Sequence, residues 1–275
     1  MPARTDARDL ESIAKKVVAS LADHRQIPVF SGSRQDLDLE DAYRVTRLLR
    51  AAFEARGETI VGRKIGFTNR DMWKAHGVEA PIWGYCTDRT MFELKDTPAQ
   101  SVKNFVEPRI EPEIIFGLKK APLPSMDQSA LLDCIDWVSL GYEVVQSIYP
   151  GWKFAAADTV VANALHGALL VGTRHPIAKT KTAWQHELAT FCVELHCDGN
   201  LSQTGGGAFV LDSPLFALQH LVKRLADDPH NPPLRAGEII STGTLTLAMP
   251  VSAGQTWTTK VHGISLESIT LRFEA

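Results

Sequence analysis

The stretch Phe105-Val-Glu-Pro-Arg-Ile-Glu-Pro-Glu-Ile-Ile-Phe-Gly117 carries the strongest structural signal in the chain. Alternate side chains of a β-strand share one face of its sheet, so Glu111 and Glu113 are predicted to point the same way. The opposite face of the strand is apolar and consists of Ile110, Ile114 and Phe116. Two carboxylates side by side in an apolar strand repel each other unless a positive charge lies between them. A divalent cation with oxygen ligands would supply that charge.

A second predicted strand, residues 137–145, has the same unusual pattern. Glu143 lies on one face, and the other face is apolar, with Val138, Leu140, Tyr142 and Val144. Three carboxylates from two strands suit Mg²⁺ or Mn²⁺, which keep coordination positions open for water or substrate oxygens. Spacing alone leaves an alternative open, because Glu-x-Glu on a strand is often just a solvated face.

The rest of the chain has a helical start and a β-rich remainder. One helix is predicted from the apolar stripe Leu10, Ile13, Ala14, Val17, Val18 and Leu21. A second helix is predicted from Asp38, which can cap its first turn, to Gly57. From residue 59, short β-branched and aromatic runs alternate with Gly, Pro and Asp, and residues 213–226 form one later helix. We therefore predict an α+β protein, with a helical region over residues 1–58 and a larger β-rich domain of the sandwich, roll or barrel kind over 59–275.

Composition and charge are those of an ordinary globular protein. Of the 275 residues, 44% are hydrophobic and 22% are charged. The net charge of −3 argues against a general nucleic-acid binder, and no apolar stretch is long enough for a membrane span. The polar N-terminus lacks the apolar core of a signal peptide. The four cysteines have no metal-ligand spacing, so we interpret them as buried free thiols of a cytoplasmic protein: Cys86, Cys134, Cys192 and Cys197.

Seven short motifs follow one another along the chain. They are Gly62-Arg-Lys-Ile-Gly-Phe-Thr68, Pro81-Ile-Trp-Gly84, Pro108-Arg-Ile-Glu-Pro-Glu-Ile-Ile-Phe116, Tyr142-Glu-Val-Val145, Asp158-Thr-Val-Val-Ala-Asn163, Thr204-Gly-Gly-Gly-Ala208 and Gly237-Glu-Ile-Ile-Ser-Thr-Gly-Thr244. In this order they resemble the 2-keto-4-pentenoate hydratase family, which includes 2-oxohepta-3-ene-1,7-dioate hydratase and 4-oxalocrotonate decarboxylase. This family lies within the fumarylacetoacetate hydrolase superfamily. The resemblance runs from about residue 10 to the C-terminus.

The resemblance implies a mixed β-sandwich or roll of the fumarylacetoacetate hydrolase C-terminal type, with an added N-terminal helical region. It implies that Glu111, Glu113 and Glu143 hold the metal, Mg²⁺ or Mn²⁺, and that Lys64 is the active-site lysine. The family's substrates carry a 2-oxo or 2-enol carboxylate, which would chelate the metal through two oxygens. A desolvated lysine near a metal can have its pKa lowered enough for acid–base work.

Other motif residues are candidates for contact with the substrate or for support of the site. The substrate-binding candidates, which offer hydroxyls or a close backbone approach, are Thr204, Gly205, Gly206, Ser241, Thr242 and Thr244. An ordinary hairpin turn is the alternative for residues 241–244. Asp158 and Lys153 are candidates for holding ligands or substrate through hydrogen bonds, with a surface position as the alternative for Lys153.

Two motifs depart from the family pattern. Where the hydratases carry an Asp in the motif at residues 81–84, this chain has Ile82, which cannot activate or position water. The Asn-Ala-Ser-Ser-Gly run expected after Asp-Thr-Val is here Asn163-Ala-Leu-His-Gly167. His166 could replace a lost hydroxyl contact or act as a catalytic acid–base group, with a hydrogen-bonded core histidine as the alternative.

Taken with the resemblance, the sequence predicts a metal-dependent lyase. The expected reaction is that of a 2-keto-4-pentenoate-type hydratase, acting on a small 2-oxo or 2-hydroxy alkenoate through a metal-chelated dienolate. A 4-oxalocrotonate-type decarboxylase is the alternative, and Ile82 favours it. A C–C bond hydrolase and a non-catalytic subunit that pairs with an active relative are the remaining alternatives. The family also leads us to expect a homo-oligomer and allows a complex with a related pathway enzyme, since exposed β edges favour association.

Overall fold

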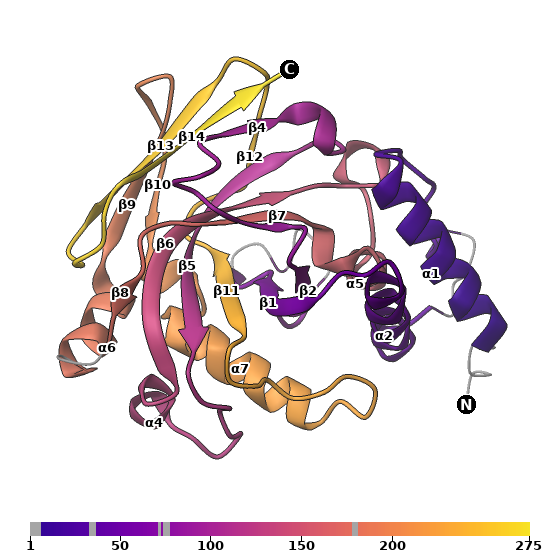
Figure 1. The fold of residues 1–275 in the computed structure, drawn as a ribbon, viewed down its shortest axis with the longest axis horizontal. Coiled ribbons are helices and arrows are strands. Elements are labelled where there is room, and N and C mark those ends of the chain that lie inside the picture. Colours follow the sequence, from indigo (N-terminus) through magenta and orange to yellow (C-terminus); the bar gives the residue numbers. More distant parts are fainter. Residues whose placement is uncertain (1–6, 33–36, 71–72, 74–77, 178–180) are drawn as a thin grey trace.

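The strands of the protein form two sheets, shown in the computed structural model of Figure 1. The structure describes residues 7–32, 37–70, 73, 78–177 and 181–275. Within these residues the larger sheet has nine strands and the smaller has five. The α+β architecture predicted from the sequence is confirmed.

The larger sheet is built around two long antiparallel strands, β5 (Arg109–Leu118) and β6 (Ile135–Val145). Its main path runs β2-β1-β11-β5-β6-β7-β3 in the described residues, with β12 beside β5 and β8 beside β6. The other bounds are β1 (Ile60–Gly66), β2 (Ile82–Thr87), β3 (Met91–Glu93), β7 (His166–Val171), β8 (His175–Pro176), β11 (Ile239–Thr244) and β12 (Met249–Pro250). Because β1, β11, β5 and β6 are neighbours, residues far apart in sequence share one face.

The smaller sheet covers the opposite face of β6. Its order is β10-β9-β13-β14-β4, with bounds β4 (Ala99–Ser101), β9 (Cys192–Cys197), β10 (Asn200–Gly206), β13 (Thr256–His262) and β14 (Ile269–Glu274). Tyr142, on the face of β6 away from Glu143, donates to the carbonyl of Ile269 over 3.1 Å. This contact ties the two sheets together and leaves the Glu143 face for other partners.

The predicted helices are confirmed. They are α1 (Ala7–Ala22), α2 (Leu39–Ala55) and α7 (Pro214–Ala226). Asp38 caps α2 by accepting from the amide of Asp41, and Ser213 caps α7 by accepting from Leu215. The prediction missed three short helices between strands: α4 (Gln128–Leu132), α5 (Ala156–Val161) and α6 (Lys181–Thr190).

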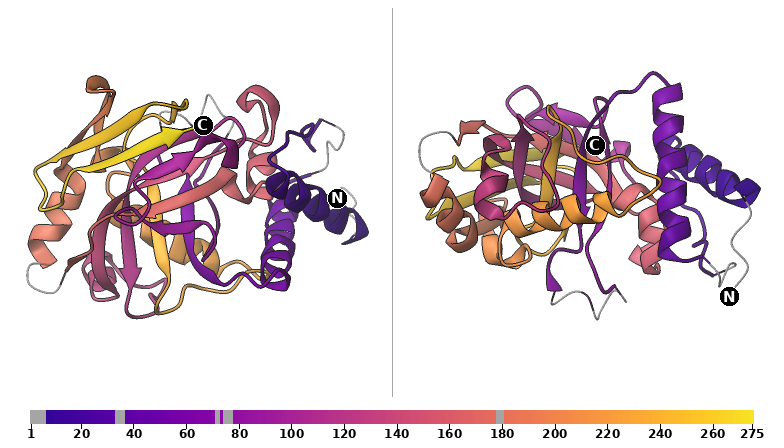
Figure 2. Two further views of the ribbon diagram at one scale, coloured as in Figure 1. Left: turned by 45° about the horizontal axis from the view of Figure 1, so that its top comes forward. Right: turned by 90° about the horizontal axis from the view of Figure 1, so that it is seen from below.

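The N-terminal helices lie at one side of the strands, beside α5 (Figure 2). Buried residues of α1 and α2 belong to the same hydrophobic core as those of β5 and β6. The division at residue 58 stays a prediction. No helix in the described part of the chain is long and apolar enough to cross a membrane.

The cysteine prediction needs a correction. All four cysteines are free, but Cys192 is exposed and Cys197 is only half-buried, whereas Cys86 and Cys134 are buried. Cys192 and Cys197 end the short strand β9 of the smaller sheet, where their side chains lie near or at the surface.

Candidate functional site

Strand register brings together the three glutamates that the sequence singled out. Glu111 of β5 lies directly opposite Glu143 of β6, and Glu113 lies opposite Gly141. One carboxylate oxygen from each glutamate lies within 4.8 Å of the others. Glu113 and Glu143 are fully buried, and Glu111 is partly exposed to a cavity. Such a cluster in a dry interior requires positive charge nearby.

Two of the carboxylates are held from behind by groups outside the cluster. Ser241 Oγ and the amide of Gly243 donate to Glu113 Oε2, over 2.5 and 2.8 Å. His166 Nδ1 lies 2.8 Å from Glu143 Oε1. These contacts fix the orientation of the carboxylates, as hydrogen bonds to metal ligands commonly do.

The remaining oxygens fit a divalent cation. Among the described residues, Glu113 Oε1 and Glu143 Oε2 are buried and accept no hydrogen bond, although Glu143 Oε2 forms an ion pair with Lys64 Nζ at 3.1 Å. A buried carboxylate oxygen without such a partner is costly. A small hard cation would satisfy these oxygens, and three carboxylates match its preferred ligands. The residues present therefore fit a divalent metal ion.

The electrostatics of the cluster reflect burial and mutual repulsion. Burial raises the pKa of Glu113 well above its ordinary 4.5, and the charges of Glu143 and Glu111 add to the effect. Burial also raises the pKa of Glu111 to about 7; Lys64 offsets part of this, and Glu143 adds to it. For Glu143, burial is outweighed by Lys64 and His166, so its pKa is lowered. The proton and the metal thus compete for Glu111 and Glu113.

Lys64 stands on β1, with its ammonium between the glutamates and the turn that follows α5. It is 3% exposed, and its Nζ donates to the carbonyl of Ala164 over 3.0 Å. Burial alone would lower the pKa of Lys64, but the charges of Glu143, Glu111 and Glu113 raise it above the ordinary value. In the metal-free chain the three carboxylates therefore favour the charged form of Lys64, and the lowered pKa expected beside a bound metal stays a prediction.

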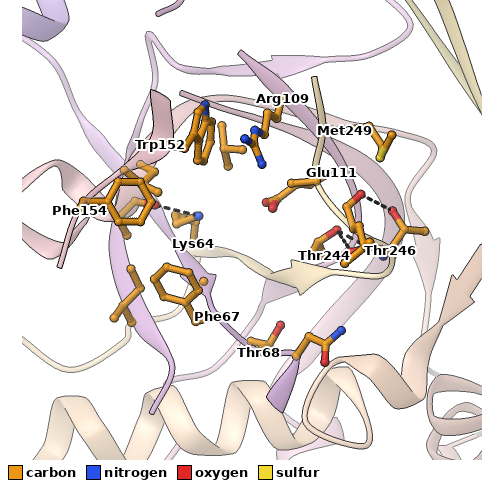
Figure 3. Close-up of a pocket in the computed structure, with 18 residues that line it drawn as sticks. Lys64, Phe67, Thr68, Arg109, Glu111, Trp152, Phe154, Thr244, Thr246 and Met249 are labelled. Atoms are coloured by element: carbon orange, nitrogen blue, oxygen red, sulfur yellow. Dashed lines mark hydrogen bonds between the residues drawn. The ribbon is translucent and has the colours of Figure 1, made fainter. Parts of the chain in front are cut away.

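A cavity of about 240 Å³ opens onto Glu111 and Lys64 (Figure 3). Its polar lining also includes Arg109, whose guanidinium lies 4.1 Å from the ring centroid of Trp152. The lining residues that sequence reasoning missed include Phe67, Thr68, Asn69, Arg109, Trp152, Phe154, Thr246, Leu247 and Met249. Arg109 could have been found, because it alternates with Glu111 and Glu113 on one face of β5. The aromatic residues stand outside regular strands and gave no such signal.

Of the substrate-binding candidates, only one belongs to the described lining of the cavity. Thr244 lines the cavity, whereas Ser241 contacts Glu113 and Thr242 Oγ1 donates to the carbonyl of Ile114. The segment of residues 204–206, Thr204, Gly205 and Gly206, lies on β10 and is absent from the cavity lining. A Cβ on Gly205 would lie only 1.9 Å from the carbonyl oxygen of Leu245, so these glycines approach backbone rather than the cavity.

The two supporting candidates do not reach the glutamates. Asp158 accepts from the amides of Phe30, Ser31 and Ala155, over 2.9 to 3.0 Å, and so joins the start of α5 to the loop after α1. Lys153 is exposed, while its neighbours Trp152 and Phe154 line the cavity. The residues on either side of Lys153 therefore line the cavity, whereas Lys153, the residue chosen from the sequence, does not.

His166 lies behind Glu143 rather than in the cavity with Lys64. Its Nε2 is 2.9 Å from Thr90 Oγ1, and it lines a second cavity of about 430 Å³. A neutral ring that donates from Nδ1 to Glu143 and accepts from Thr90 satisfies both nitrogens. The catalytic role expected of His166 stays a prediction. Ile82, the other departure from the family pattern, lines the cavity together with Lys64.

Comparison with known proteins decides the family. The chain is 31% identical over 273 residues to 4-oxalocrotonate decarboxylase of Pseudomonas sp. strain CF600, covering 98% of this chain and 99% of the relative. The chain belongs to the family of 2-keto-4-pentenoate hydratases and 4-oxalocrotonate decarboxylases. It is also 28% identical to 2-hydroxyhexa-2,4-dienoate hydratase of Comamonas testosteroni, over 96% of this chain and 98% of the relative. No protein-family model matches the chain.

Solved structures agree with the family assignment. A 4-oxalocrotonate decarboxylase from Pseudomonas putida G7, complexed with magnesium and adipate, matches with a TM-score of 0.89 and 28% identity, covering 98% of this chain and all of that one. A fumarylacetoacetate isomerase/hydrolase-type protein from Oleispira antarctica shares the fold, with a TM-score of 0.58 at 17% identity and coverage of 78% and 93%. The predicted superfamily fold is confirmed. The chain is a metal-dependent lyase, of the hydratase or decarboxylase kind.

Proposed function

We propose that this lyase decarboxylates a small 2-oxo dicarboxylate of the 4-oxalocrotonate kind, with Mg²⁺ or Mn²⁺ held by Glu111, Glu113 and Glu143. The observation that carries the proposal is Arg109. It shares the cavity wall with Glu111 and has no ion-pair partner among the residues described. A guanidinium is well suited to bind a carboxylate, and one that lines a cavity without an ion pair to a described carboxylate suits a second substrate carboxylate. The related decarboxylase was complexed with adipate, itself a dicarboxylate.

Different residues of the chain act on the two ends of such a substrate. A divalent cation at the glutamates would act as a Lewis acid on the 2-oxo end. Arg109 binds and orients the distal carboxylate before it leaves. As the bond to that carboxylate breaks and CO₂ departs, its electron pair flows through the conjugated chain toward the 2-oxo oxygen. Lys64 stabilises the negative charge there, and a proton then adds to the carbon chain.

The wall around Ile82 supports decarboxylation over hydration. Ile82 is 4% exposed and lines the cavity, where a carboxylate would be needed to activate water. Within the described cavity lining, Glu111 is the sole carboxylate, and it belongs to the metal cluster. The apolar side chain of Ile82 at this position also favours departure of CO₂ over addition of water.

Hydration is the second candidate, and the hydroxyl groups in the cavity favour it. Thr68, Thr244 and Thr246 line the cavity, and they could hold a water by hydrogen bonds. The 28% identity to a hydratase over almost the whole chain supports the same alternative. Both reactions need the same glutamates and Lys64.

His166 is proposed to orient Glu143 from behind. Its Nδ1–H donates to Glu143 Oε1, and Thr90 fixes the ring by donating to Nε2. This role does not require the imidazole to change its charge. Asp158 joins α5 to the loop after α1, and Lys153 is exposed, which supports structural rather than catalytic roles for both.

A homo-oligomer is also proposed. Strand β10 ends the smaller sheet, and its Leu201 is 57% exposed, which suits an edge that another copy covers. Light scattering should give a mass that is a multiple of 30.2 kDa. A mass of one chain would contradict this proposal.

One assay separates the two reactions. The purified chain is incubated with Mg²⁺ and either 4-oxalocrotonate or 2-hydroxypenta-2,4-dienoate, while CO₂ and absorbance are followed. We expect one CO₂ per dicarboxylate consumed and little turnover of the monocarboxylate. Incorporation of ¹⁸O from labelled water without CO₂ release would establish the hydratase instead.

A further inference from the structure

The turn of residues 163–165 has an unusual backbone. Asn163, Ala164 and Leu165 have φ values of 54°, 51° and 63°, so three successive non-glycine residues lie in the left-handed region. Residues with a Cβ visit this region singly and seldom in runs. Such strain persists where the surroundings fix it, and it concentrates at functional sites.

Asn163 locks the beginning of this left-handed turn. Its Oδ1 accepts from the amide of Tyr85 over 2.8 Å, and its Nδ2 donates to the carbonyl of Tyr85 over 2.9 Å. A Cβ on Gly84 would lie 2.5 Å from the carbonyl oxygen of Asn163, so only glycine lets the turn come this close to β2. At the other end, the carbonyl of Leu165 accepts from the amide of Gln146 over 2.9 Å.

The locked turn presents one carbonyl to Lys64. Gly84 is the residue opposite Lys64 in the β1–β2 register, so the turn lies directly over the lysine. The carbonyl of Ala164 accepts from Lys64 Nζ over 3.0 Å. A second side of the ammonium faces Glu143 Oε2 at 3.1 Å, and Lys64 also lines the cavity. An ammonium has three donors, so one remains for the cavity.

The two contacts of Lys64 respond differently to a metal ion. Glu143 Oε2 is one of the oxygens that fit the cation, so a bound metal would compete for it and repel the ammonium. The Ala164 carbonyl is neutral and is not among the oxygens that fit the cation, so it can keep its hydrogen bond to Lys64. Without that carbonyl, nothing described on this side of the ammonium would hold it at the cavity wall.

We propose that the left-handed turn of residues 163–165 is a positioning device for Lys64, locked by Asn163. It keeps the ammonium directed at the cavity once Glu143 is engaged by metal. Asn163 acts through the turn and does not touch the substrate. The inference rests on the proposed role of Lys64 in the reaction.

A double-mutant cycle tests this inference. We expect Asn163→Ala to lower kcat roughly 10²-fold, the cost of misplacing one reacting group, with KM changed less than kcat. Affinity for Mn²⁺, measured by titration, should stay within about three-fold, since the ligands are untouched. In a Lys64→Ala background, Asn163→Ala should cause no further loss, because the turn then has nothing to position.

A matched control and a milder variant complete the design. Asn231 is also buried against Tyr85, with its Oδ1 accepting from the Tyr85 hydroxyl over 3.0 Å, but it does not touch the turn. Asn231→Ala should lower stability and leave kcat unchanged. Asn163→Asp keeps the acceptor for the Tyr85 amide and loses the donor, so it should give a smaller loss and serves if Asn163→Ala fails to fold.

Multiplicative losses in the double mutant would overturn the inference, as would a parallel fall in Mn²⁺ affinity. Either result would mean that Asn163 supports the fold and not Lys64. The cycle is run on whichever reaction the wild type catalyses, CO₂ release or hydration. Failure of the decarboxylase proposal therefore leaves this test intact.

Discussion

Two walls of the cavity differ in how their side chains are held. The acidic wall presents Lys64 and Glu111 to the cavity, with Glu113 and Glu143 buried beside them, and stands on the hydrogen-bonded strands β1, β5 and β6. The aromatic wall, Phe67, Trp152 and Phe154, stands on segments outside regular strands, where Phe67 and Trp152 have φ values of 54° and 59°. Sheet register fixes the first wall closely. The second wall depends on turns, so we expect the acidic wall to set the chemistry and the aromatic wall to select the substrate.

The largest effect should come from the acidic wall. Glu113→Gln keeps the shape of the side chain and removes a charged ligand, so we expect kcat/KM to fall roughly 10³-fold, equal to about 4 kcal/mol of transition-state stabilisation. The matched control is Glu194→Gln on β9, whose side chain is 40% exposed in the smaller sheet. It should retain activity. If kcat/KM fell by a comparable factor in both variants, the loss in Glu113→Gln would reflect damage to the fold and not to the site.

Arg109 joins the two walls, and its loss should have the second largest effect. Arg109→Gln should lower kcat/KM for 4-oxalocrotonate roughly 10²-fold, the value of a charge-assisted hydrogen bond. Arg174 is the control, because it also lies over a tryptophan, 4.6 Å from the ring centroid of Trp137, but outside the cavity lining. Equal kinetics for wild type and Arg109→Gln would remove the basis for a dicarboxylate substrate.

The aromatic wall should give smaller losses confined to substrate binding. Phe154→Ala is expected to raise KM about ten-fold, because it exposes apolar surface that the substrate chain would contact. Lys153→Ala, one residue away and exposed, should change KM by less than about two-fold. A fall in kcat alone for Phe154→Ala would show that this wall takes part in the chemistry.

The pH dependence of stability should show the smallest effect. The pKa of Glu111 is raised in the folded chain to about 7 from 4.5, so its stabilising contribution is full below about pH 4.5 and is lost as the pH rises through 7. The metal-free chain should therefore unfold roughly 5 °C lower at pH 8 than at pH 6. Lys64 does not oppose this trend, because its pKa is raised from 10.5 and lies above the window.

Added Mg²⁺ should reduce this difference, since the ion binds ionised carboxylates in the folded state. Glu111→Gln should flatten the curve without metal. Scanning calorimetry checks both expectations, and a midpoint that rises from pH 6 to pH 8 in the metal-free chain would contradict the raised pKa of the buried Glu111.

The same contrast explains how much the sequence could predict. The period of two placed Glu111 and Glu113 on one face of the stretch 105–117 and set Glu143 opposite an apolar face in residues 137–145. The strand register that brings these faces together could not be read from that period, and the family resemblance singled out Lys64. Trp152 and Phe154 could not be found, because turn geometry and not a repeating pattern directs them into the cavity. The substrate contact expected of Thr204 stays a prediction, since Thr204 lies outside the described cavity lining and its neighbour Gly205 serves a close approach to the backbone of Leu245.

Direct titration of the purified, metal-free chain with Mn²⁺ tests the central claim, that three glutamates from two strands form one metal site. We predict one ion bound per chain in the wild type, loss of that binding in Glu113→Gln, and unchanged binding in Glu194→Gln. Absence of binding in the wild type, or retention of full affinity in Glu113→Gln, would contradict the account.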